Sequence, residues 1–546
     1  MAKHFINTVE GFVDDAIDGL LRGGAGEGLA RLDAPTGIRV VLRDPLPQGR
    51  VALVSGGGSG HEPAHAGFVG AGMLSAAICG DIFSSPPVDA VLAALRAVTG
   101  PAGAVLIVKN YTGDRLNFGL AAERARAEGL AVEMVLVSDD IALPDAPQAR
   151  GLAGTLLVHK IAGAAAEAGA DLATVAALAR RVAEQVRTIG LSLTSCAIPG
   201  QDSADRIAGE EAEFGLGIHG EPGAGTIPLT EARTLMEPLQ AALIEATGGA
   251  GDLALVVNML GGVPPIEAQV IAEAVLTGPL AERAACVIGP APFMTALDMR
   301  GVSLSVLPLD AELRALLDAP AGPVSWMPAR ALAGPKLIPL PATSGEVAPP
   351  PSDDPETRAM IETICATVAQ MAPDLDALDA RVGDGDTGSS FAAGARDLDA
   401  RTDSLPLADP AALFVTLGRV LTQRMGGSAG VLLSILFSAA GHQAEAGEAP
   451  ARALRLGLER MKELGGAARG DRTMIDALEP ALDALVAGGS LDEAARAARA
   501  GAEETARMTG ARAGRSAYVP GEHLSGNADP GAEGVARLFE ALAANV

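Results

Sequence analysis

Three aspartates stand close together in the stretch from residue 379 to residue 390, which reads Asp-Ala-Arg-Val-Gly-Asp-Gly-Asp-Thr-Gly-Ser-Ser. They are Asp379, Asp384 and Asp386, and the glycines between them allow a tight loop that can approach a ligand closely. Such carboxylates repel one another unless a cation lies among them. Oxygen ligands without a nearby cysteine or histidine suit Mg²⁺ or Ca²⁺ rather than zinc. An EF-hand calcium loop would need a closing glutamate, and Ser390 stands there instead.

Hydroxyl groups follow the third aspartate at once. Thr387, Ser389 and Ser390 offer side-chain hydroxyls and backbone N–H groups that suit phosphate, so the stretch predicts a magnesium–nucleotide site. The alternative is a polar turn without a ligand. Residues 426–430 (Gly-Gly-Ser-Ala-Gly) precede an apolar helix, whose free N–H groups could hold a second phosphate or simply cap the helix. No GxxxxGK[ST] motif is present, which excludes the P-loop scheme of nucleotide binding.

Polar residues also follow two predicted strands in the first half of the chain. His61 ends a glycine-rich segment, and Lys109 and Asp114 flank the turn after another strand. Because α/β folds place ligands where strands end, these residues could serve as a base and as hydrogen-bond donors toward a small polyol. A plain turn is the alternative for each segment. His219 is bracketed by glycines that leave its ring little cover, which favours a functional histidine over a core one.

Strands and helices alternate in this first half, which predicts an α/β fold with two lobes and a loop-rich segment at 192–225. The predicted helices cover 8–22, 151–168 and 171–190, and the predicted strands cover 38–43, 51–54, 105–108, 130–138, 253–258, 285–288 and 302–307.

A segment with six prolines at 339–356 predicts an extended linker. We therefore expect an α/β domain at 1–338 and a second domain at 357–546. The second domain is predicted to be helical throughout, with helices near 358–377, 389–400, 410–425, 428–445, 450–464, 472–487, 491–508 and 533–545.

Composition narrows the class of partner. The 546 residues include 41 basic and 67 acidic side chains, a net charge of −26, which argues against nucleic acid as a partner. No window is long and apolar enough for a membrane span, and the first residues lack the apolar core of a signal peptide. The four cysteines, Cys79, Cys196, Cys286 and Cys365, are far apart, which predicts free thiols in a reducing cytoplasm.

Several motifs in this order make the whole chain resemble the single-chain, ATP-dependent dihydroxyacetone kinases. The most specific are Ser-Gly-Gly-Gly-Ser-Gly-His-Glu-Pro at 55–63, Lys-Asn-Tyr-Thr-Gly-Asp at 109–114, Gly-Ile-His-Gly-Glu-Pro at 217–222, Gly-Asp-Gly-Asp-Thr-Gly at 383–388 and Gly-Asp-Arg-Thr-Met at 470–474.

For the front domain, the resemblance implies that His219 bonds covalently to the substrate's carbonyl carbon as a hemiaminal. A neutral imidazole nitrogen can add to a ketone but has no second proton to lose, so the adduct stops short of a Schiff base. Glycerol has no carbonyl group to trap. The resemblance also implies that His61 and Asp114 take the proton of the attacking hydroxyl, and that the pocket is completed by Gly58, Ser59, Gly60 and Lys109.

For the second domain, the resemblance implies an eight-helix barrel in which Asp379, Asp384 and Asp386 hold two Mg²⁺ ions at the ATP phosphates. Arg472 stands where the family usually has lysine, and residues 518–529 are one residue longer than expected. The implied nucleotide contacts are Thr387, Gly388, Ser389, Ser390, Ser428, Ala429, Gly465, Met474, Arg515, Asp529, Pro530 and Gly531.

We therefore expect a homodimeric enzyme that phosphorylates dihydroxyacetone with Mg-ATP. Erythrulose or glyceraldehyde could be the preferred acceptor instead, because the histidine reads only a carbonyl and its neighbouring hydroxymethyl group. Cyclisation of FAD to cyclic FMN, known in some relatives, is a rival reaction. A non-catalytic regulator that binds ketose and nucleotide is a rival class, and the presence of His219, Asp114 and the three metal-loop acids speaks against it.

Overall fold

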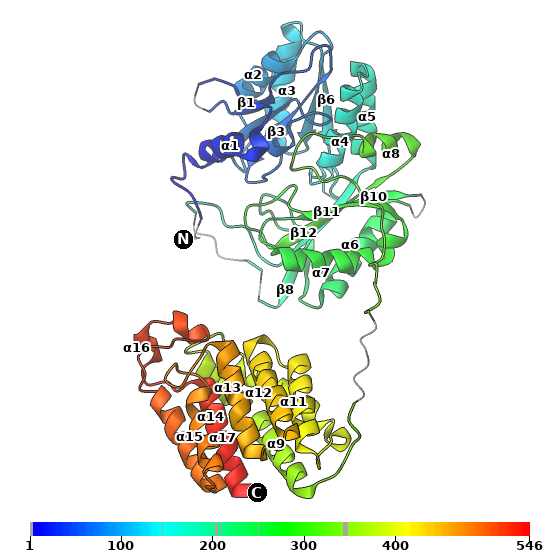
Figure 1. Ribbon diagram of the computed structural model, residues 1–546. Coiled ribbons are helices and arrows are strands. Elements are labelled where there is room, and N and C mark those ends of the chain that lie inside the picture. Colours follow the sequence, from blue (N-terminus) through cyan, green and yellow to red (C-terminus); the bar gives the residue numbers. More distant parts are fainter. Residues whose placement is uncertain are drawn as a thin grey trace. The chain divides into compact units, whose positions relative to one another are not determined.

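The chain folds into two compact units, Met1–Leu337 and Ile338–Val546 (Figure 1). The computed structural model describes residues 4–35, 37–144, 146–201, 206–207, 209–248, 251–341 and 348–545. Residues 342–347 of the predicted linker and the side chain of Arg515 lie outside the described residues. The assignment of the ketose to the first unit and of Mg-ATP to the second stays a prediction.

The first unit contains two six-stranded sheets, as the predicted two-lobed α/β fold requires. In the first sheet the order is β1-β2-β4-β3-β5-β6, with β3 parallel to both of its neighbours and β1 and β2 antiparallel at one edge. The strands are β1 (Leu29–Arg31), β2 (Val40–Arg43), β3 (Ala52–Ser59), β4 (Ala76–Ile82), β5 (Ala104–Lys109) and β6 (Val132–Val137).

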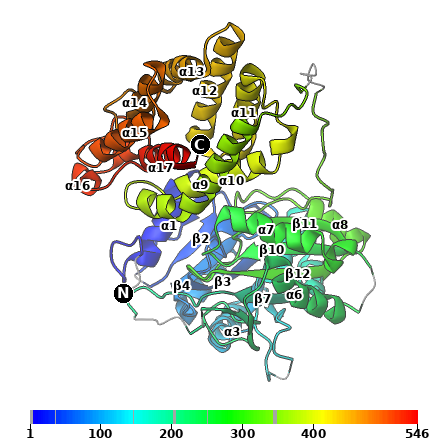
Figure 2. The same ribbon diagram turned by 90° about the horizontal axis from the view of Figure 1, so that it is seen from below.

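In the second sheet the order is β11-β10-β12-β7-β8-β9, and only β10 and β11 are parallel. Figure 2 shows β10, β12 and β7 as neighbours in this sheet, and β3 and β4 as neighbours in the other. The strands are β7 (Arg187–Ser192), β8 (Glu211–Phe214), β9 (Gly225–Pro228), β10 (Leu253–Met259), β11 (Ala284–Ala291) and β12 (Gly301–Pro308).

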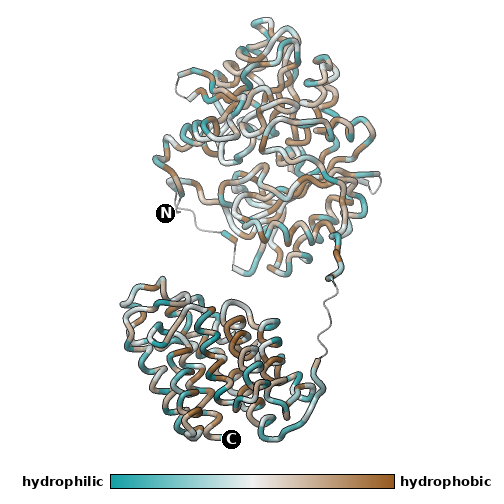
Figure 3. The backbone as a smooth tube through the Cα atoms, viewed as in Figure 1, coloured by the Kyte–Doolittle hydropathy of each residue, from teal (hydrophilic) through white to brown (hydrophobic). Residues whose placement is uncertain are grey.

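Helices cover both faces of both sheets. One core joins the outer face of the first sheet to α2 and α3, a second fills the space between the sheets with α1, α4, α5 and α8, and a third joins the second sheet to α6 and α7. The hydrophobic stretches of the tube in Figure 3 follow these buried strands. The helices are α1 (Phe12–Arg22), α2 (Val88–Val98), α3 (Thr112–Ala127), α4 (Thr155–Glu167), α5 (Leu172–Gln185), α6 (Ala232–Ala246), α7 (Pro265–Leu276) and α8 (Ala311–Asp318).

Some predicted boundaries in this unit are wrong. The helix predicted at 171–190 ends at Gln185, because Thr188 and Ile189 belong to β7 and pair with β12. Strand β3 continues through the glycine-rich segment to Ser59, whereas the prediction ended the strand at residue 54. The segment at 192–225, predicted to be loop-rich, contains β8 and begins β9, and strands β1 and β4 were not predicted.

The second unit is helical, as predicted. Each of its eight long helices packs against the next, and α17 packs back against α9, so the helices close a ring. Its helix starts carry strong signals, such as Asp354 and Asp409, whose side chains accept from backbone N–H groups in the first turns of α9 and α11. The described helices are α9 (Pro355–Asp379), α10 (Thr387–Asp399), α11 (Pro410–Arg424), α12 (Gly427–Glu445), α13 (Pro450–Gly465), α14 (Ile475–Val486), α15 (Leu491–Thr505), α17 (Pro530–Asn545) and the short α16 (Gly521–Leu524).

Within the described part of the chain, no helix combines the length and the apolar character needed to cross a membrane. All four cysteines are free, and three of them are buried.

Candidate functional site

Strand ends gather the predicted pocket residues of the first unit. Strands β3 and β5 are parallel neighbours, so their carboxyl ends meet at one edge of the sheet. His61 follows the end of β3, Lys109 is the last residue of β5, and Asp114 lies in the first turn of α3. His219 comes from the second sheet, in the connection between β8 and β9. The structure therefore brings together residues that are up to 158 positions apart, the separation of His219 from His61.

Glycines at the end of β3 let other groups approach the backbone. A methyl group at Gly58 would lie 2.6 Å from the backbone nitrogen of Ser84, which leaves no room for any side chain. A methyl group at Gly57 would lie 3.7 Å from both Lys109 Nζ and Asp114 Oδ2. The lysine and the aspartate thus lie over the same backbone position.

His61 presents a bare ring nitrogen to this region. Its Nδ1 lies 2.8 Å from the carbonyl oxygen of Thr295, and because a carbonyl only accepts, Nδ1 must donate. Burial, together with the charge of Lys109, lowers the pKa of His61 well below its usual value. The ring is therefore neutral, and Nε2 keeps its lone pair. This nitrogen is buried and has no partner among the described residues, so it is available as a proton acceptor.

His219 is held in the same way by Glu221. The backbone N–H of His219 donates to Glu221 Oε2 at 2.9 Å, and His219 Nδ1 lies 3.2 Å from Glu221 Oε1. Burial raises the pKa of Glu221, but the hydrogen bonds that it accepts from His219 outweigh burial and hold that pKa at about 2. Because an ionised carboxylate only accepts, Nδ1 of His219 carries the proton.

Aromatic rings enclose His219. The ring centroids of Tyr111, His61 and Phe83 lie 4.3, 4.8 and 5.4 Å from that of His219. The His219 side chain is only 16% exposed, so the expectation that its glycine neighbours leave the ring uncovered is wrong. Its cover comes from distant elements.

Four polar atoms are buried near these rings without a hydrogen-bond partner among the described residues. They are His61 Nε2, Lys109 Nζ, Tyr111 Oη and Asp114 Oδ1. Burial lowers the pKa of Lys109, although Asp114 and other carboxylates raise it. An unpartnered buried polar group costs about 1–3 kcal/mol, so a cluster of them points to a small polar ligand.

Two other predicted pocket residues already have partners. The Ser59 hydroxyl donates to the carbonyl oxygen of Gly80 at 2.8 Å, and the Gly60 N–H donates to Glu62 at 2.9 Å. These bonds hold the end of β3 in shape, and any contact of Ser59 and Gly60 with a ligand stays a prediction.

In the second unit, the loop between α9 and α10 brings Asp379, Asp384 and Asp386 together. Each offers a carboxylate oxygen, and these oxygens lie within 4.8 Å of one another. Asp379 is buried, and its Oδ2 accepts from the backbone N–H groups of Gly385 at 3.1 Å, Asp386 at 3.1 Å and Thr387 at 3.2 Å. The other two carboxylates are exposed. A set of hard oxygen donors in a glycine-shaped loop fits Mg²⁺.

The predicted phosphate-binding groups are engaged by carboxylates of α9. The Thr387 hydroxyl donates to Asp379 at 2.9 Å, and the backbone N–H and hydroxyl of Ser389 donate to Asp376 at 2.9 and 2.5 Å. Gly388 is pressed against α9, where an added methyl group would lie 1.9 Å from the Ala372 carbonyl oxygen. Ser390 donates its N–H to the Asp386 carbonyl group as part of the first turn.

Arg472, which is 1% exposed, links the turns that contain Ser516 and Asn527 by hydrogen bonds. It donates to the Ser516 hydroxyl at 3.2 Å and to the Asn527 carbonyl oxygen at 2.8 Å, and Ser516 donates to the carbonyl oxygen of Val382 in the metal loop at 3.3 Å. The next turn begins α17, where Asp529 accepts from the Ala532 N–H at 2.9 Å.

The remaining predicted nucleotide contacts fall into two groups. Met474 precedes α14 and lies beside Gly531, where an added methyl group would be 3.2 Å from Met474 Cβ; Pro530 is the first residue of α17. Ser428 and Ala429 lie in the first turn of α12, and Gly465 ends α13.

Sequence reasoning missed Phe83, Tyr111, Glu221 and Asp376. Glu221 and Tyr111 lie inside the recognised motifs at 217–222 and 109–114, so these motifs could have pointed to both residues. Nothing in the sequence around Phe83 or Asp376 connects them with the histidines or with Ser389.

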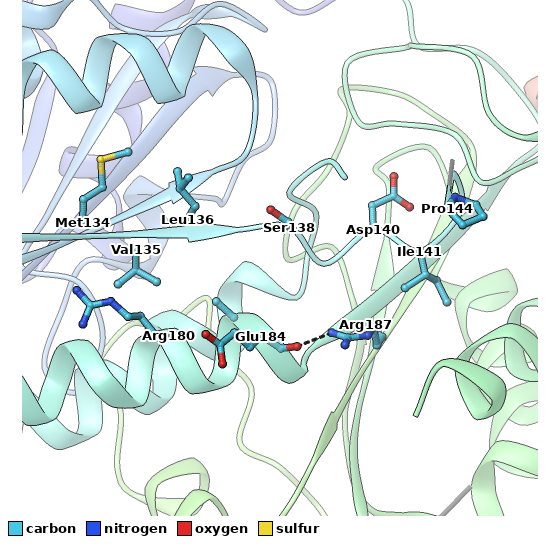
Figure 4. Close-up of a pocket in the computed structure, with 11 residues that line it drawn as sticks. Met134, Val135, Leu136, Ser138, Asp140, Ile141, Pro144, Arg180, Glu184 and Arg187 are labelled. Atoms are coloured by element: carbon cyan, nitrogen blue, oxygen red, sulfur yellow. Dashed lines mark hydrogen bonds between the residues drawn. The ribbon is translucent and has the colours of Figure 1, made fainter. Parts of the chain in front are cut away.

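A cavity of about 670 Å³ lies elsewhere, between β6, α5 and the start of β7 (Figure 4). Three of its four charged side chains have partners: Arg180 pairs with Glu133, Arg187 donates to the Glu184 carbonyl oxygen at 2.8 Å, and Asp140 pairs with Arg150. None of the predicted site residues lines it.

Two domain families match parts of the chain. Residues 28–324 match the Dak1 domain and residues 381–544 match the DAK2 domain. The chain is 47% identical to a dihydroxyacetone kinase of Citrobacter freundii, over all of this chain and 99% of the relative. It is 40% identical to a human triokinase/FMN cyclase, over 99% of each chain. The crystal structure of the C. freundii dihydroxyacetone kinase in complex with AMP-PNP and Mg²⁺ superposes with a TM-score of 0.74 at 45% identity, over the full length of both chains.

Proposed function

The chain belongs to the dihydroxyacetone kinase family, and from that premise we propose how it phosphorylates dihydroxyacetone with Mg-ATP. The enzyme transfers the γ-phosphoryl group of ATP to a hydroxyl group of the ketose. The first unit is proposed to hold the ketose, and the second to hold ATP and Mg²⁺.

The ketose is proposed to bind covalently to His219. The observation that carries this proposal is that Nδ1 of His219 lies 3.2 Å from the Glu221 carboxylate, which leaves Nε2 as the nitrogen that can bond to a ketone in a pocket shared with His61 and Asp114. The lone pair forms a bond to the carbonyl carbon, the π electrons move to the carbonyl oxygen, that oxygen takes up a proton from solvent, and the ring releases its Nδ1 proton to solvent. The result is a hemiaminal, and glycerol cannot form one.

His61 and Asp114 are proposed to accept the proton of the hydroxyl group that attacks ATP. The Nε2 of His61 is neutral, buried and without a partner, and Asp114 Oδ1 is likewise buried and unpartnered, which supports either group as the base. Lys109 is proposed to donate hydrogen bonds to the substrate with the ammonium group that lies over Gly57. Gly58, Ser59 and Gly60 are proposed to shape the wall of the pocket.

Asp379, Asp384 and Asp386 are proposed to hold Mg²⁺ at the ATP phosphates. When bound, the metal supplies positive charge that neutralises the transferring phosphoryl group. The first turn of α10, from Thr387 to Ser390, is proposed to contact the phosphates by sharing donors that Asp376 and Asp379 now hold. The remaining nucleotide contacts are proposed for Ser428, Ala429, Gly465, Met474, Arg515, Asp529, Pro530 and Gly531.

The test is ADP release from Mg-ATP with dihydroxyacetone, erythrulose, glyceraldehyde and glycerol, each compared between the natural chain and His219→Ala. We expect turnover with a carbonyl substrate, none with glycerol, and a rise in KM of about 10²-fold or more in the variant, because its binding loses a covalent bond. Equal activity with glycerol, or an unaffected variant, would show that His219 does not trap the substrate. The preferred acceptor is the substrate with the highest kcat/KM.

FAD cyclisation is a second candidate activity, supported by the similarity of the chain to the human triokinase/FMN cyclase. It would need the nucleotide-binding unit alone. Incubation with FAD, followed by chromatography for cyclic FMN, tests it, and His219→Ala is expected to leave this activity unchanged.

We also propose a homodimer in the cytoplasm. Four free cysteines support a reducing compartment, and the family resemblance supports the dimer. Light scattering across a concentration series measures the mass directly, and a monomer at all concentrations contradicts the proposed dimer.

A further inference from the structure

Glu221 stands two residues after His219 and turns its carboxylate back onto it. One oxygen accepts the backbone N–H of His219 at 2.9 Å, and the other lies 3.2 Å from Nδ1 of the same residue. A single carboxylate therefore fixes both the main chain and the ring of the histidine. Neither residue's role in this pairing follows from the sequence pattern alone.

We propose that Glu221 is a positioning residue that holds His219 in the Nδ1-protonated tautomer and offsets the positive charge that the ring acquires when Nε2 bonds to a ketone carbon. This inference rests on the proposed function, because it assigns a partner to the covalent step. Glu221 is not proposed to touch the substrate.

The Glu221 carboxylate occupies space that any side chain at position 217 would fill, and residue 217 is glycine. A methyl group at Gly217 would lie 2.2 Å from Glu221 Oε2 and 2.8 Å from Arg150 Nη1, so only glycine admits both groups. Arg150 donates to the Gly215 carbonyl oxygen at 2.7 Å and anchors the loop. Gly220 adopts a φ of +79°, which allows the chain to turn Glu221 back toward His219. The glycines around His219 thus allow Glu221 to contact His219, and they do not leave the His219 ring exposed.

The covalent step needs such a partner because its charges must balance. As the Nε2 lone pair forms the C–N bond, the imidazole becomes cationic and the carbonyl oxygen becomes anionic. The oxygen then takes up one proton from solvent and the ring releases its Nδ1 proton to solvent past the Glu221 carboxylate, so the protons balance and the hemiaminal is neutral. An ionised carboxylate beside Nδ1 stabilises the cationic ring, as the buried aspartate does for the histidine of a hydrolase triad. No oxidant or further reactant is required.

The tautomer can be read by NMR of the full chain with ¹⁵N-labelled imidazole groups. The chain contains seven histidines, and His219→Asn identifies the signals of His219 by their loss. We expect the natural chain at neutral pH to show a protonated Nδ1 and a bare Nε2 at His219. In Glu221→Gln the amide offers one oxygen and one NH₂ group, so it cannot accept both N–H groups, and we expect a population with protonated Nε2.

Glu213→Gln is the matched control. Glu213 supports the same loop by accepting the Gly223 N–H at 2.8 Å and pairing with Arg206, and neither of these interactions involves His219. We expect the His219 signals of this variant to match those of the natural chain. An equal change in both variants would show that only the fold of the loop matters, and would overturn the proposal.

Kinetics provide the second measurement. Loss of a residue that orients a reactive group commonly costs 10- to 100-fold, so we expect kcat/KM for the ketose to fall by about that factor in Glu221→Gln. The proposal is overturned if His219 of the natural chain carries its proton on Nε2, which needs no variant to observe, or if Glu221→Gln leaves the tautomer unchanged. If His219 shows a bare Nε2 but no carbonyl substrate releases ADP, the proposed function fails while the assignment of Glu221 as the group that fixes the tautomer stands.

Discussion

At the scale of single residues, the two candidate sites depend on groups that only accept hydrogen bonds. The Thr295 carbonyl oxygen and the Glu221 carboxylate each hold a histidine Nδ1, and Asp379 holds the metal loop. In each case an acceptor fixes the direction of a functional group. Substitutions that remove such an acceptor should therefore lower the stability of the fold, whereas substitutions that remove only a metal ligand should weaken ligand binding.

The metal loop allows that difference to be measured. Asp379→Ala leaves the partly buried backbone donors of Gly385, Asp386 and Thr387 without an acceptor, so we expect a loss of about 1–3 kcal/mol in the free energy of unfolding. Asp386→Asn changes an exposed carboxylate of the same cluster, and we expect weaker Mg²⁺-dependent ATP binding with little change in stability. Thermal unfolding and calorimetric titration of Mg-ATP measure the two effects. Identical behaviour of both variants would contradict these separate roles.

Asp529 gives a prediction for pH dependence. Burial raises its pKa from 3.8 to about 6, although Arg472 and the Ala532 N–H lower it. The folded chain then binds this proton more tightly than the unfolded chain. Stability from this group is present at low pH and is lost as the pH rises from about 4 to about 6, by on the order of 3 kcal/mol.

Asn at position 529 keeps an oxygen that can accept the Ala532 N–H but carries no charge. We expect Asp529→Asn to unfold at a higher temperature than the natural chain at pH 8, and the difference to shrink toward pH 4. Thermal unfolding of both chains across this range measures it. A difference that does not vary with pH would mean that Asp529 does not titrate there.

At the scale of elements, close packing against glycines positions the pocket. Gly58→Ala would place a methyl group 2.6 Å from the Ser84 nitrogen and 2.7 Å from the Phe83 backbone, so the chain that carries Phe83 must move away from the histidines. We expect a raised KM for the ketose and a lower unfolding temperature. Gly119→Ala in α3 is the control, because nothing lies within 4 Å and alanine stabilises a helix interior by up to ~1 kcal/mol. An unchanged KM for the ketose in Gly58→Ala would contradict the proposal that Gly58 shapes the wall of the ketose pocket.

The same scale explains what could be predicted from the sequence. Periodicity and local spacing predict the eight long helices of the second unit, the two α/β lobes of the first unit, and the cluster of Asp379, Asp384 and Asp386. Strands β8 and β9 are short and lie in glycine- and proline-rich sequence, so no alternation marked them. The rings of Tyr111 and Phe83 reach His219 only through tertiary packing, which spacing along the chain does not encode.

At the scale of the whole molecule, each unit has hydrophobic cores of its own. We expect residues 1–337 and 338–546 to fold when produced separately, the first binding the ketose and the second binding Mg-ATP. Neither should release ADP in response to a ketose. A mixture should regain activity that rises with concentration, because the covalent link no longer supplies a high effective concentration. Ketose-dependent ADP release by either unit alone would contradict the division of labour.

The central claim is that a ketose becomes bonded to a nitrogen of His219. The most direct measurement combines dihydroxyacetone labelled with ¹³C at its carbonyl carbon with the full chain labelled with ¹⁵N in its histidines. We expect a tetrahedral carbon with a one-bond coupling to one imidazole nitrogen in the natural chain, and no such coupling in His219→Asn. A bound ketose whose carbon shows no coupling to nitrogen in the natural chain would contradict the claim.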